Sequence, residues 1–394
     1  MICHLICFSG LPYSLNQAGL PLGLFLLVLV AFITDYSIIL LIKGGNLSGT
    51  NSYQSLVRST FGITGFLVLS LLQFLYPFIA MISYNIITGD TLTKVFQRLP
   101  GVGPGHILAE RHFVIAVSTI LFTLPLSLFR NISKLGKVSL LSMVLTVFIL
   151  ITVIIRAELH TKQPHKNVIW TIHSFMIYGS LKEQSLSNWS RVTHISVGSA
   201  MIVSILFAAT GYATFTGYTQ GDIFENYCGN DDLATFGRFC FGISIITTFP
   251  LECFVTREVV SNVFFKGSLN NHAHVAVTLL IVAACTALSL AYDCLGIVLV
   301  LNGVVSATPL IFIIPSACYL KLSAERWFQG ENRIPCLILI AGVFVMTTGL
   351  VMAVMFPQDC SHGAEMFYCA TSNLSITPTP PTELLFQNST QNSR

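Results

Sequence analysis

Charged residues are scarce in this chain. Asp, Glu, Lys and Arg together make up 9% of its 394 residues, whereas about 25% is usual for soluble globular proteins. Because 53% of the residues are hydrophobic, this scarcity excludes a soluble domain. The net charge of +3 is small for so long a chain, and it gives no reason to expect nucleic acid as a partner.

Signatures of catalysis are absent from the sequence as well. It contains no His-Glu-x-x-His, no Gly-x-Ser-x-Gly, no P-loop, and no acidic cluster at ligand spacing within its apolar runs. We therefore expect neither an enzyme nor a resident cofactor. Met1–Phe8 also lacks the basic residues and the full apolar core of a cleavable signal peptide, so targeting is expected to come from internal helices.

Long apolar runs dominate what is present. Runs of about 17 to 25 residues can cross a hydrocarbon layer of roughly 30 Å as helices, and the alternating pattern of membrane strands is absent. We predict an all-α, polytopic membrane helix bundle. Its nine full spans are approximately Leu20–Ile42, Phe61–Ile87, Phe113–Phe129, Val138–Ile155, Ile195–Phe215, Leu233–Val255, Val275–Leu290, Leu295–Leu320 and Ile334–Phe356.

Lysine and arginine in the connecting loops predict the orientation, because cytosolic loops are enriched in both. The loop Gly217–Asp232 is acidic, contains no Lys or Arg, and is predicted to lie outside. The tail 357–394 then lies outside too. Lys94, Arg98 and Arg111 are the exception, because this scheme also places their loop outside. The loops predicted to be cytosolic all carry basic residues: Arg130–Lys137, Lys182–Arg191, Arg257–Lys266 and Lys321–Arg333.

The predicted extracellular tail carries candidate modification sites. Asn373 and Asn388 each begin a glycosylation sequon. Cys360 and Cys369 lie beyond the last apolar run, where an oxidising environment permits disulfides. We predict a Cys360–Cys369 bond, with Cys228 of the acidic loop as the competing partner.

The orientation of the spans requires one further crossing. The fourth span ends outside near Arg156 and the fifth begins inside near Arg191. The apolar stretch between them, 168–181, covers roughly 21 Å as a helix, which is too short to span unaided. It resembles half of a broken helix.

A second candidate half-helix precedes the first span. Ser9–Gly23 is uncharged and rich in glycine and proline, and it leads directly into a long apolar run. Helix-breaking residues persist in membranes where the freed backbone groups find partners or line a wet cavity. Broken helices of this kind build the binding sites of many transporters, so this stretch is a candidate binding-site hinge.

The sixth span carries the most informative polar pattern. Ser244 lies three and four residues before Thr247 and Thr248, so the three hydroxyls share one helix face. Pro250 leaves the carbonyl four residues earlier without its usual donor. Hydroxyl and carbonyl oxygens are the ligands that a hard cation requires. The alternative interpretation is that these hydroxyls bond their own backbone or pack between helices.

These residues resemble a known family. Gly10-Leu-Pro-Tyr13 with Gln17-Ala-Gly19, and Thr248-Phe-Pro250 with Phe254-Val-Thr-Arg257, are similar to the sodium-coupled neutral amino acid transporters of solute carrier family 38. The resemblance implies sodium-dependent symport of a neutral amino acid across the plasma membrane by alternating access, and it leaves proton exchange open. We expect a monomer, with sodium as the coupling ion.

The resemblance also implies an architecture. Two inverted five-helix repeats would occupy about 1–156 and 168–320, followed by an additional helix at 334–356. The first helix of each repeat would be unwound at mid-membrane, where backbone amides hold the substrate carboxylate.

Site residues carry over position by position. The substrate-binding segment would correspond to Ser9, Gly10 and Leu11. Sodium would lie between the first and eighth helices of the family. Thr248 is the best match to its sodium-binding hydroxyl, with Thr247 and Ser244 as neighbours.

The chain departs from the family pattern at two places. Family members carry an Asn and a Gly-Ser-Gly run just before the residues that match Gly10–Tyr13, whereas this chain has Met1–Phe8. Of the family's sixth helix, the sequence shows a remnant from about His173. Since both departures fall on binding-site helices, the alternative hypothesis is a non-transporting membrane variant with a scaffold or regulatory role.

Overall fold

The computed structural model describes residues 4–50, 52–103, 105–130, 132–160, 186–265, 267–292, 294–323, 326–355 and 366–370. Across these residues the regular elements are all helices, which confirms the all-α prediction. The long helices are α2 (Leu20–Ser48), α3 (Tyr53–Phe96), α6 (Ile132–His160), α7 (Leu186–Phe215), α9 (Asp232–Phe264), α10 (Asn271–Ala291) and α13 (Arg333–Met355).

Shorter helices complete the fold. Two of the predicted spans are built from consecutive pieces: α4 (Arg111–Ser118), η2 (Thr119–Thr123) and α5 (Leu124–Ser127) form one, and α11 (Leu295–Leu301), η5 (Asn302–Ala307), η6 (Pro309–Ile313) and α12 (Ile314–Leu322) form the other. The remaining short helices are α1 (His4–Ala18), η1 (Ile107–Ala109), η4 (Thr216–Tyr218), α8 (Ile223–Asn226), η7 (Gly330–Asn332) and α14 (Phe367–Ala370).

The nine predicted spans all correspond to helices. Eight of them are long and apolar enough to cross a membrane. The remaining one, the third in chain order, is a shorter apolar helix, Arg111–Ser127. The half-helix at 168–181 and the sequons at Asn373 and Asn388 lie outside the described residues. The division into two inverted repeats stays a prediction.

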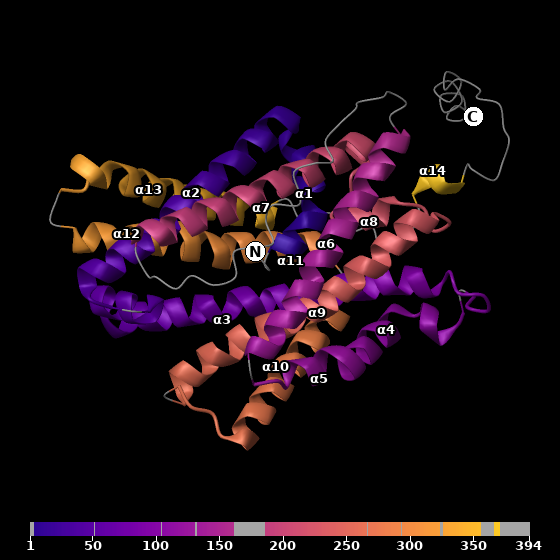
Figure 1. Ribbon diagram of the computed structural model, residues 1–394, viewed down its shortest axis with the longest axis horizontal. Helices are drawn as coiled ribbons and strands as arrows, with labels where there is room; N and C mark the ends of the chain where they lie inside the picture. Colours follow the sequence, from indigo (N-terminus) through magenta and orange to yellow (C-terminus); the bar gives the residue numbers. More distant parts are fainter. Residues whose placement is uncertain are drawn as a thin grey trace, which may run out of the picture.

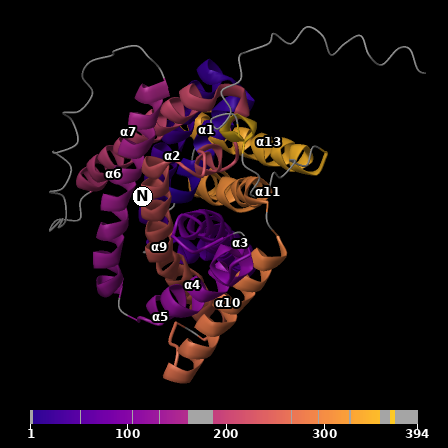
Figure 2. The ribbon, with the colours of Figure 1, turned by 90° about the vertical axis from the view of Figure 1, so that its right-hand side faces the viewer.

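Helix α9 lies at the centre of the bundle and packs along α3 (Figures 1 and 2). Within its most apolar window 72% of the residues are buried, against 11% for α2 and for α13. Since α2 and α13 present most of their apolar side chains outward, they form the lipid-facing rim. The polar face of the sixth span is therefore directed into the protein.

Wide helical turns precede prolines in two spans. The segments η2, η5 and η6 are π-helical, and Pro125, Pro309 and Pro315 each lie within or just after one of them. A proline has no N–H and clashes with the preceding turn, so a wider turn keeps the chain helical at these points. The eighth span is therefore a kinked helix.

The predicted hinge Ser9–Gly23 contains a break in the structure, but the break does not fall at the candidate substrate residues. α1 is helical from His4 to Ala18, with Pro12 inside it, so Ser9, Gly10 and Leu11 are not unwound. The break comes at Gly19, whose φ of 80° and ψ of 145° end α1 before α2 begins at Leu20. Such a backbone conformation is readily available only to glycine, which explains the position of the break.

One end of the bundle, here named the α8 face, holds α8, α14 and the carboxyl-terminal end of α3 (Figure 1). Three of its basic residues pair with acidic residues of the segment 219–231, here named the α8 loop, or with the first residue of α9: Lys94 with Glu225, Arg156 with Asp231, and Arg98 with Asp232. These pairs place the loop after α3 beside the acidic loop. Lys94 and Arg98, the exceptions to the predicted orientation, are thus both paired with acidic residues of this face.

A disulfide joins α14 to the same face. Cys369 is bonded to Cys228, so the predicted Cys360–Cys369 pairing is wrong and the competing partner is used. The Tyr368 hydroxyl donates to the Asn226 carbonyl at 2.7 Å, and its ring stacks on Phe215. These contacts orient α14 so that Cys369 faces the α8 loop.

The disulfide predicts a non-additive mutant cycle. Because Cys228→Ser and Cys369→Ser each remove the same bond, each is expected to lower the free energy of unfolding by about 2–4 kcal/mol. The double variant should lose no more than either single variant. Thermal unfolding of the purified proteins in detergent checks this, and two additive losses would contradict the bond.

The shared face predicts a labelling pattern. Gly105 and Asn230 are exposed on the α8 face, whereas Ser268 lies beyond the far end of α9, roughly 50 Å of helix away. Each is replaced in turn, in the variants Gly105→Cys, Asn230→Cys and Ser268→Cys. In intact cells a membrane-impermeant maleimide should label both of the first two variants and not Ser268→Cys, or label Ser268→Cys and neither of the first two. The parent chain provides the background, and equal labelling of all three would exclude this arrangement.

Candidate functional site

The predicted hydroxyl face of α9 meets a serine from α6. The Ser142 hydroxyl lies 2.8 Å from that of Ser244 and 2.9 Å from that of Thr248. All three side chains are buried. We name Ser142, Ser244 and Thr248 the hydroxyl cluster.

Backbone carbonyls supply further oxygens at the cluster. The Thr248 hydroxyl donates to the Ser244 carbonyl at 2.7 Å, and the Ser244 hydroxyl donates to the Ser142 carbonyl at 3.3 Å. The Thr247 hydroxyl also donates to the Ser244 carbonyl, at 2.8 Å, whereas Ser244 and Thr248 are the residues of α9 whose hydroxyls meet Ser142. The structure thus brings Ser244 and Thr248 together with α6 and leaves Thr247 beside them.

The chemistry of the cluster suits a monovalent cation. It offers only uncharged hydroxyl and carbonyl oxygens, whereas divalent cations are usually held by carboxylates. Across the described residues no group of three or more His, Cys, Asp or Glu side chains could hold a metal ion. Ser142 was not predicted from the sequence, although Ser139, Ser142 and Thr146 are spaced by three and four residues and so share one helix face.

The candidate substrate residues on α1 have different neighbours. A Cβ built at Gly10 would lie 3.4 Å from the Leu299 side chain and 3.5 Å from the Gly221 carbonyl. Leu11 packs against the main hydrophobic core, and nothing is described of the Ser9 side chain. α1 therefore presents backbone to the loop before α8.

α1 is also held tightly against α7. A Cβ at Gly211 would come within 2.6 Å of the Pro12 ring, so this contact requires glycine on α7. The same position would lie 3.3 Å from Ile223 of α8. The residues that resemble the family's substrate segment thus lie where α1, α7 and α8 meet.

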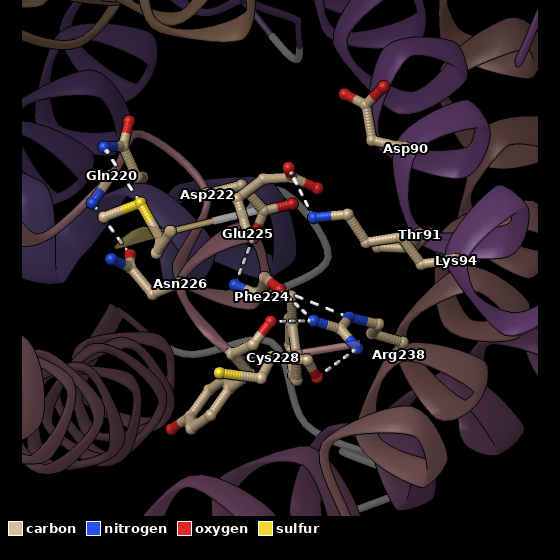
Figure 3. A network of polar contacts seen from close by, with 12 residues as sticks. Asp90, Thr91, Lys94, Gln220, Asp222, Phe224, Glu225, Asn226, Cys228 and Arg238 are labelled. Atoms are coloured by element: carbon tan, nitrogen blue, oxygen red, sulfur yellow. Dashed lines mark hydrogen bonds and ion pairs between the residues drawn. The ribbon is translucent and has the colours of Figure 1, made fainter. Parts of the chain in front are cut away.

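A buried network of charges organises the α8 loop (Figure 3). Lys94 pairs with Glu225 at 2.6 Å, and Arg111 pairs with Asp90 at 2.5 Å. Asp222 precedes α8 and accepts a hydrogen bond from the Phe224 amide at 3.0 Å. The loop is therefore tied to α3 by charge as well as by packing.

Arg238 of α9 is the most buried of these cations, with 0% of its surface exposed. It donates to the carbonyls of Phe224 at 2.9 Å, Tyr227 at 2.5 Å and Cys228 at 3.4 Å. The Phe224 carbonyl belongs to the single turn of α8 and the other two follow it, so all three have few helical donors. The guanidinium replaces those donors.

Comparisons with known proteins support a transport function for this bundle. Residues 6–355 match the family model described as transmembrane amino acid transporter protein. The chain belongs to this family. It is therefore a multi-pass membrane protein that transports amino acids, and the family is one of transporters rather than enzymes.

Two vertebrate relatives are named "Putative sodium-coupled neutral amino acid transporter 11". The one from Danio rerio is 67% identical, over 98% of this chain and 91% of the relative. The one from Homo sapiens is 55% identical, over 93% of this chain and 95% of the relative. The resemblance to sodium-coupled neutral amino acid transporters is thereby confirmed.

A more distant relative comes from Saccharomyces cerevisiae. It is named "Vacuolar amino acid transporter 2" and is 28% identical, over 91% of this chain and 81% of the relative. Its name states amino acid transport and does not mention sodium. The function shared by all three relatives is thus amino acid transport, and sodium coupling appears in the names of the nearer two.

The role of Arg238 predicts a large stability effect. Arg238→Met removes the donor from three loop carbonyls and is expected to lower the free energy of unfolding by about 3 kcal/mol. Arg98→Met, which breaks a more exposed ion pair of the same face, should change it by less than about 1 kcal/mol.

Thermal unfolding in detergent measures both variants. Arg238→Lys should recover only part of the loss, because an ammonium group lacks the forked donors of a guanidinium. Equal stability of the Arg238→Met and Arg98→Met variants would exclude the capping role.

Proposed function

We propose that this transporter couples the uptake of a neutral amino acid to sodium at the plasma membrane, as a monomer, with the α8 face and the tail outside. The hydroxyl cluster carries the sodium proposal, because it supplies buried, uncharged oxygens from two helices. The names of the nearer relatives support the same coupling ion and substrate class.

The position of the cluster suits a coupling role. Ser142 lies on α6, which falls in the first predicted repeat, whereas Ser244 and Thr248 lie on α9, in the second. Alternating access in such folds moves one group of helices against the other. A sodium ion coordinated by oxygens of both helices would stabilise one relative position of α6 and α9. The ion's higher affinity for that position is the physical basis of coupling.

Sodium would take the place of existing hydrogen bonds. The Ser142 hydroxyl already lies within 2.9 Å of both α9 hydroxyls, so the oxygens are close enough to converge on one small cation. Pro250 also leaves the carbonyl of residue 246 without its usual donor, but residue 246 is two positions from both Ser244 and Thr248 and so lies on the opposite face of α9. We assign Ser142, Ser244 and Thr248 as ligands and Thr247 as a neighbour.

The substrate segment remains Ser9, Gly10 and Leu11 in this proposal. α1 exposes backbone at Gly10, where the Gly221 carbonyl and Leu299 approach within 3.4 to 3.5 Å of a virtual Cβ. Because the amides of an intact helix are committed to carbonyls four residues earlier, binding of the substrate carboxylate here would require a local opening of α1.

The sodium proposal predicts how hydroxyl deletions change ion affinity. Thr248→Val keeps the side-chain volume and removes a ligand, so it should raise the sodium concentration for half-maximal alanine uptake about tenfold, equivalent to about 1.4 kcal/mol. Ser142→Ala should act in the same direction. Uptake into proteoliposomes, with sodium varied against choline, measures the effect.

Thr152→Val is the matched control. Thr152 is buried on the same helix as Ser142, and its hydroxyl bonds the Phe148 carbonyl of its own helix, so its sodium dependence should be that of the wild type. An unchanged sodium dependence in Thr248→Val would remove the cluster from the site. If the wild-type chain is correctly inserted but takes up no alanine or glutamine, the non-transporting variant is the better account.

A further inference from the structure

The α8 loop begins with a carboxyl group that is buried without an ion pair of its own. Asp222 is 5% exposed. Its Oδ1 atom accepts from the Phe224 amide, whereas Oδ2 has no hydrogen-bond partner within the described part of the chain. A buried carboxylate oxygen without a donor is costly, and protonation removes most of that cost.

The charged neighbours of Asp222 do not remove the need for a proton. Glu225 lies on the same loop as Asp222. Lys94 of α3 extends toward these two carboxyl groups and pairs with Glu225 (Figure 3). Further along α3, Asp90 is paired with Arg111 of α4. Three carboxyl groups therefore share two cations, and one proton makes this set neutral.

The other cations at the loop are engaged away from Asp222, since Arg156 of α6 pairs with Asp231. Arg238 of α9 is directed to the carbonyls of Phe224, Tyr227 and Cys228. α1 approaches with Gly10, and α11 approaches with Gly296, whose backbone would lie 3.9 Å from a Cβ at Gly221. Asp222 is thus surrounded by an engaged lysine, an engaged arginine and uncharged backbone.

Burial, followed by the negative charge of Glu225, raises the pKa of the Asp222 carboxyl from 3.8 to about 7. Asp222 lies between the spans Thr193–Tyr218 and Asp232–Phe264. Its protonation therefore changes over the physiological range, at the end of the bundle rather than within the hydrocarbon layer.

The position of Asp222 links this proton to α1. The preceding residue, Gly221, places its carbonyl against Gly10, and the following residue, Ile223, packs beside the Gly211–Pro12 contact. Both neighbours of Asp222 thus touch the elements that hold the candidate substrate segment. A change in the packing of Asp222 is transmitted directly to α1.

We propose that Asp222 is a proton-binding site that controls the packing of the α8 loop on α1. With the proton bound, the neutral carboxyl stays buried and the loop remains closed over Gly10. When the proton leaves, the carboxylate requires water or a cation, and the loop opens. The effect on uptake rests on the proposed function, whereas the proton site itself does not.

Infrared titration of the purified chain tests the site directly. The wild type should show a carboxyl component that titrates near pH 7, and Asp222→Asn should lack it. Asparagine is chosen because it retains the cap on α8. Asp232→Asn, whose parent side chain is 93% exposed, is the matched control and should keep the component. Its persistence in Asp222→Asn, or its absence from the wild type, would overturn the proposal.

A second measurement uses stability, so that the test does not depend on one spectroscopic signal. The folded-state pKa is raised, so folding binds the Asp222 proton more tightly and the stabilisation is complete below about pH 4. It is lost as pH rises to about 7 and stays lost above. The thermal midpoint of the wild type should therefore fall between pH 5 and 7.5 relative to that of Asp222→Asn. Parallel curves would contradict the site.

Uptake then tests the functional consequence. Sodium-driven alanine uptake by the wild type should rise several-fold between external pH 6 and 8, with a midpoint near 7, and Asp232→Asn should behave alike. Uptake by the Asp222→Asn variant should be slow and independent of pH. A wild-type pH profile in this variant would overturn the proposal that Asp222 controls the packing of the loop on α1. If the wild type shows no sodium-dependent uptake at any pH, the proposed function fails, and the infrared titration still decides the proton site.

Discussion

A hydrocarbon layer offers no water to a backbone amide or carbonyl, so the chain must satisfy these groups itself. Helices do so along their length, and every interruption of a helix needs another partner. In this protein two buried arginines of α9 supply such partners. Arg238 donates to the loop carbonyls of Phe224, Tyr227 and Cys228 on the α8 face.

Arg257 has the equivalent role at the other end of α9. It donates to the Ser127 carbonyl at 2.9 Å and to the Phe129 carbonyl at 3.3 Å, where the short helix α5 ends. Its third contact, to the Thr278 hydroxyl at 3.0 Å, reaches α10. α9 is thus anchored at both ends by charge-assisted hydrogen bonds, and Ser244 and Thr248 lie between the anchors. A sodium ion at the hydroxyl cluster would bind to the most firmly held helix of the bundle.

Opposite charges determine the arrangement of the α8 face. Lys94 and Arg98 extend from the end of α3 to Glu225 and Asp232, and the Cys228–Cys369 bond ties α14 to the same loop. This assembly places the Gly221 carbonyl against Gly10. The loop therefore covers the part of α1 that resembles the family's substrate segment, and its ion pairs tie it to α3.

The sequence by itself determined the nine spans and the polar face of α9, because both depend on local hydrophobicity and on helical spacing. Only the tertiary structure identified Ser142 as a member of the hydroxyl cluster, the pairing of Lys94 with Glu225, and the choice of Cys228 over Cys360. The Lys94–Glu225 pair and the Cys228–Cys369 bond each join residues more than one hundred positions apart. Such contacts depend on which helices pack together, and local sequence does not specify that. The position of the break within Ser9–Gly23, at Gly19 and not at Ser9–Leu11, also came from the structure, because glycine and proline occur throughout this stretch.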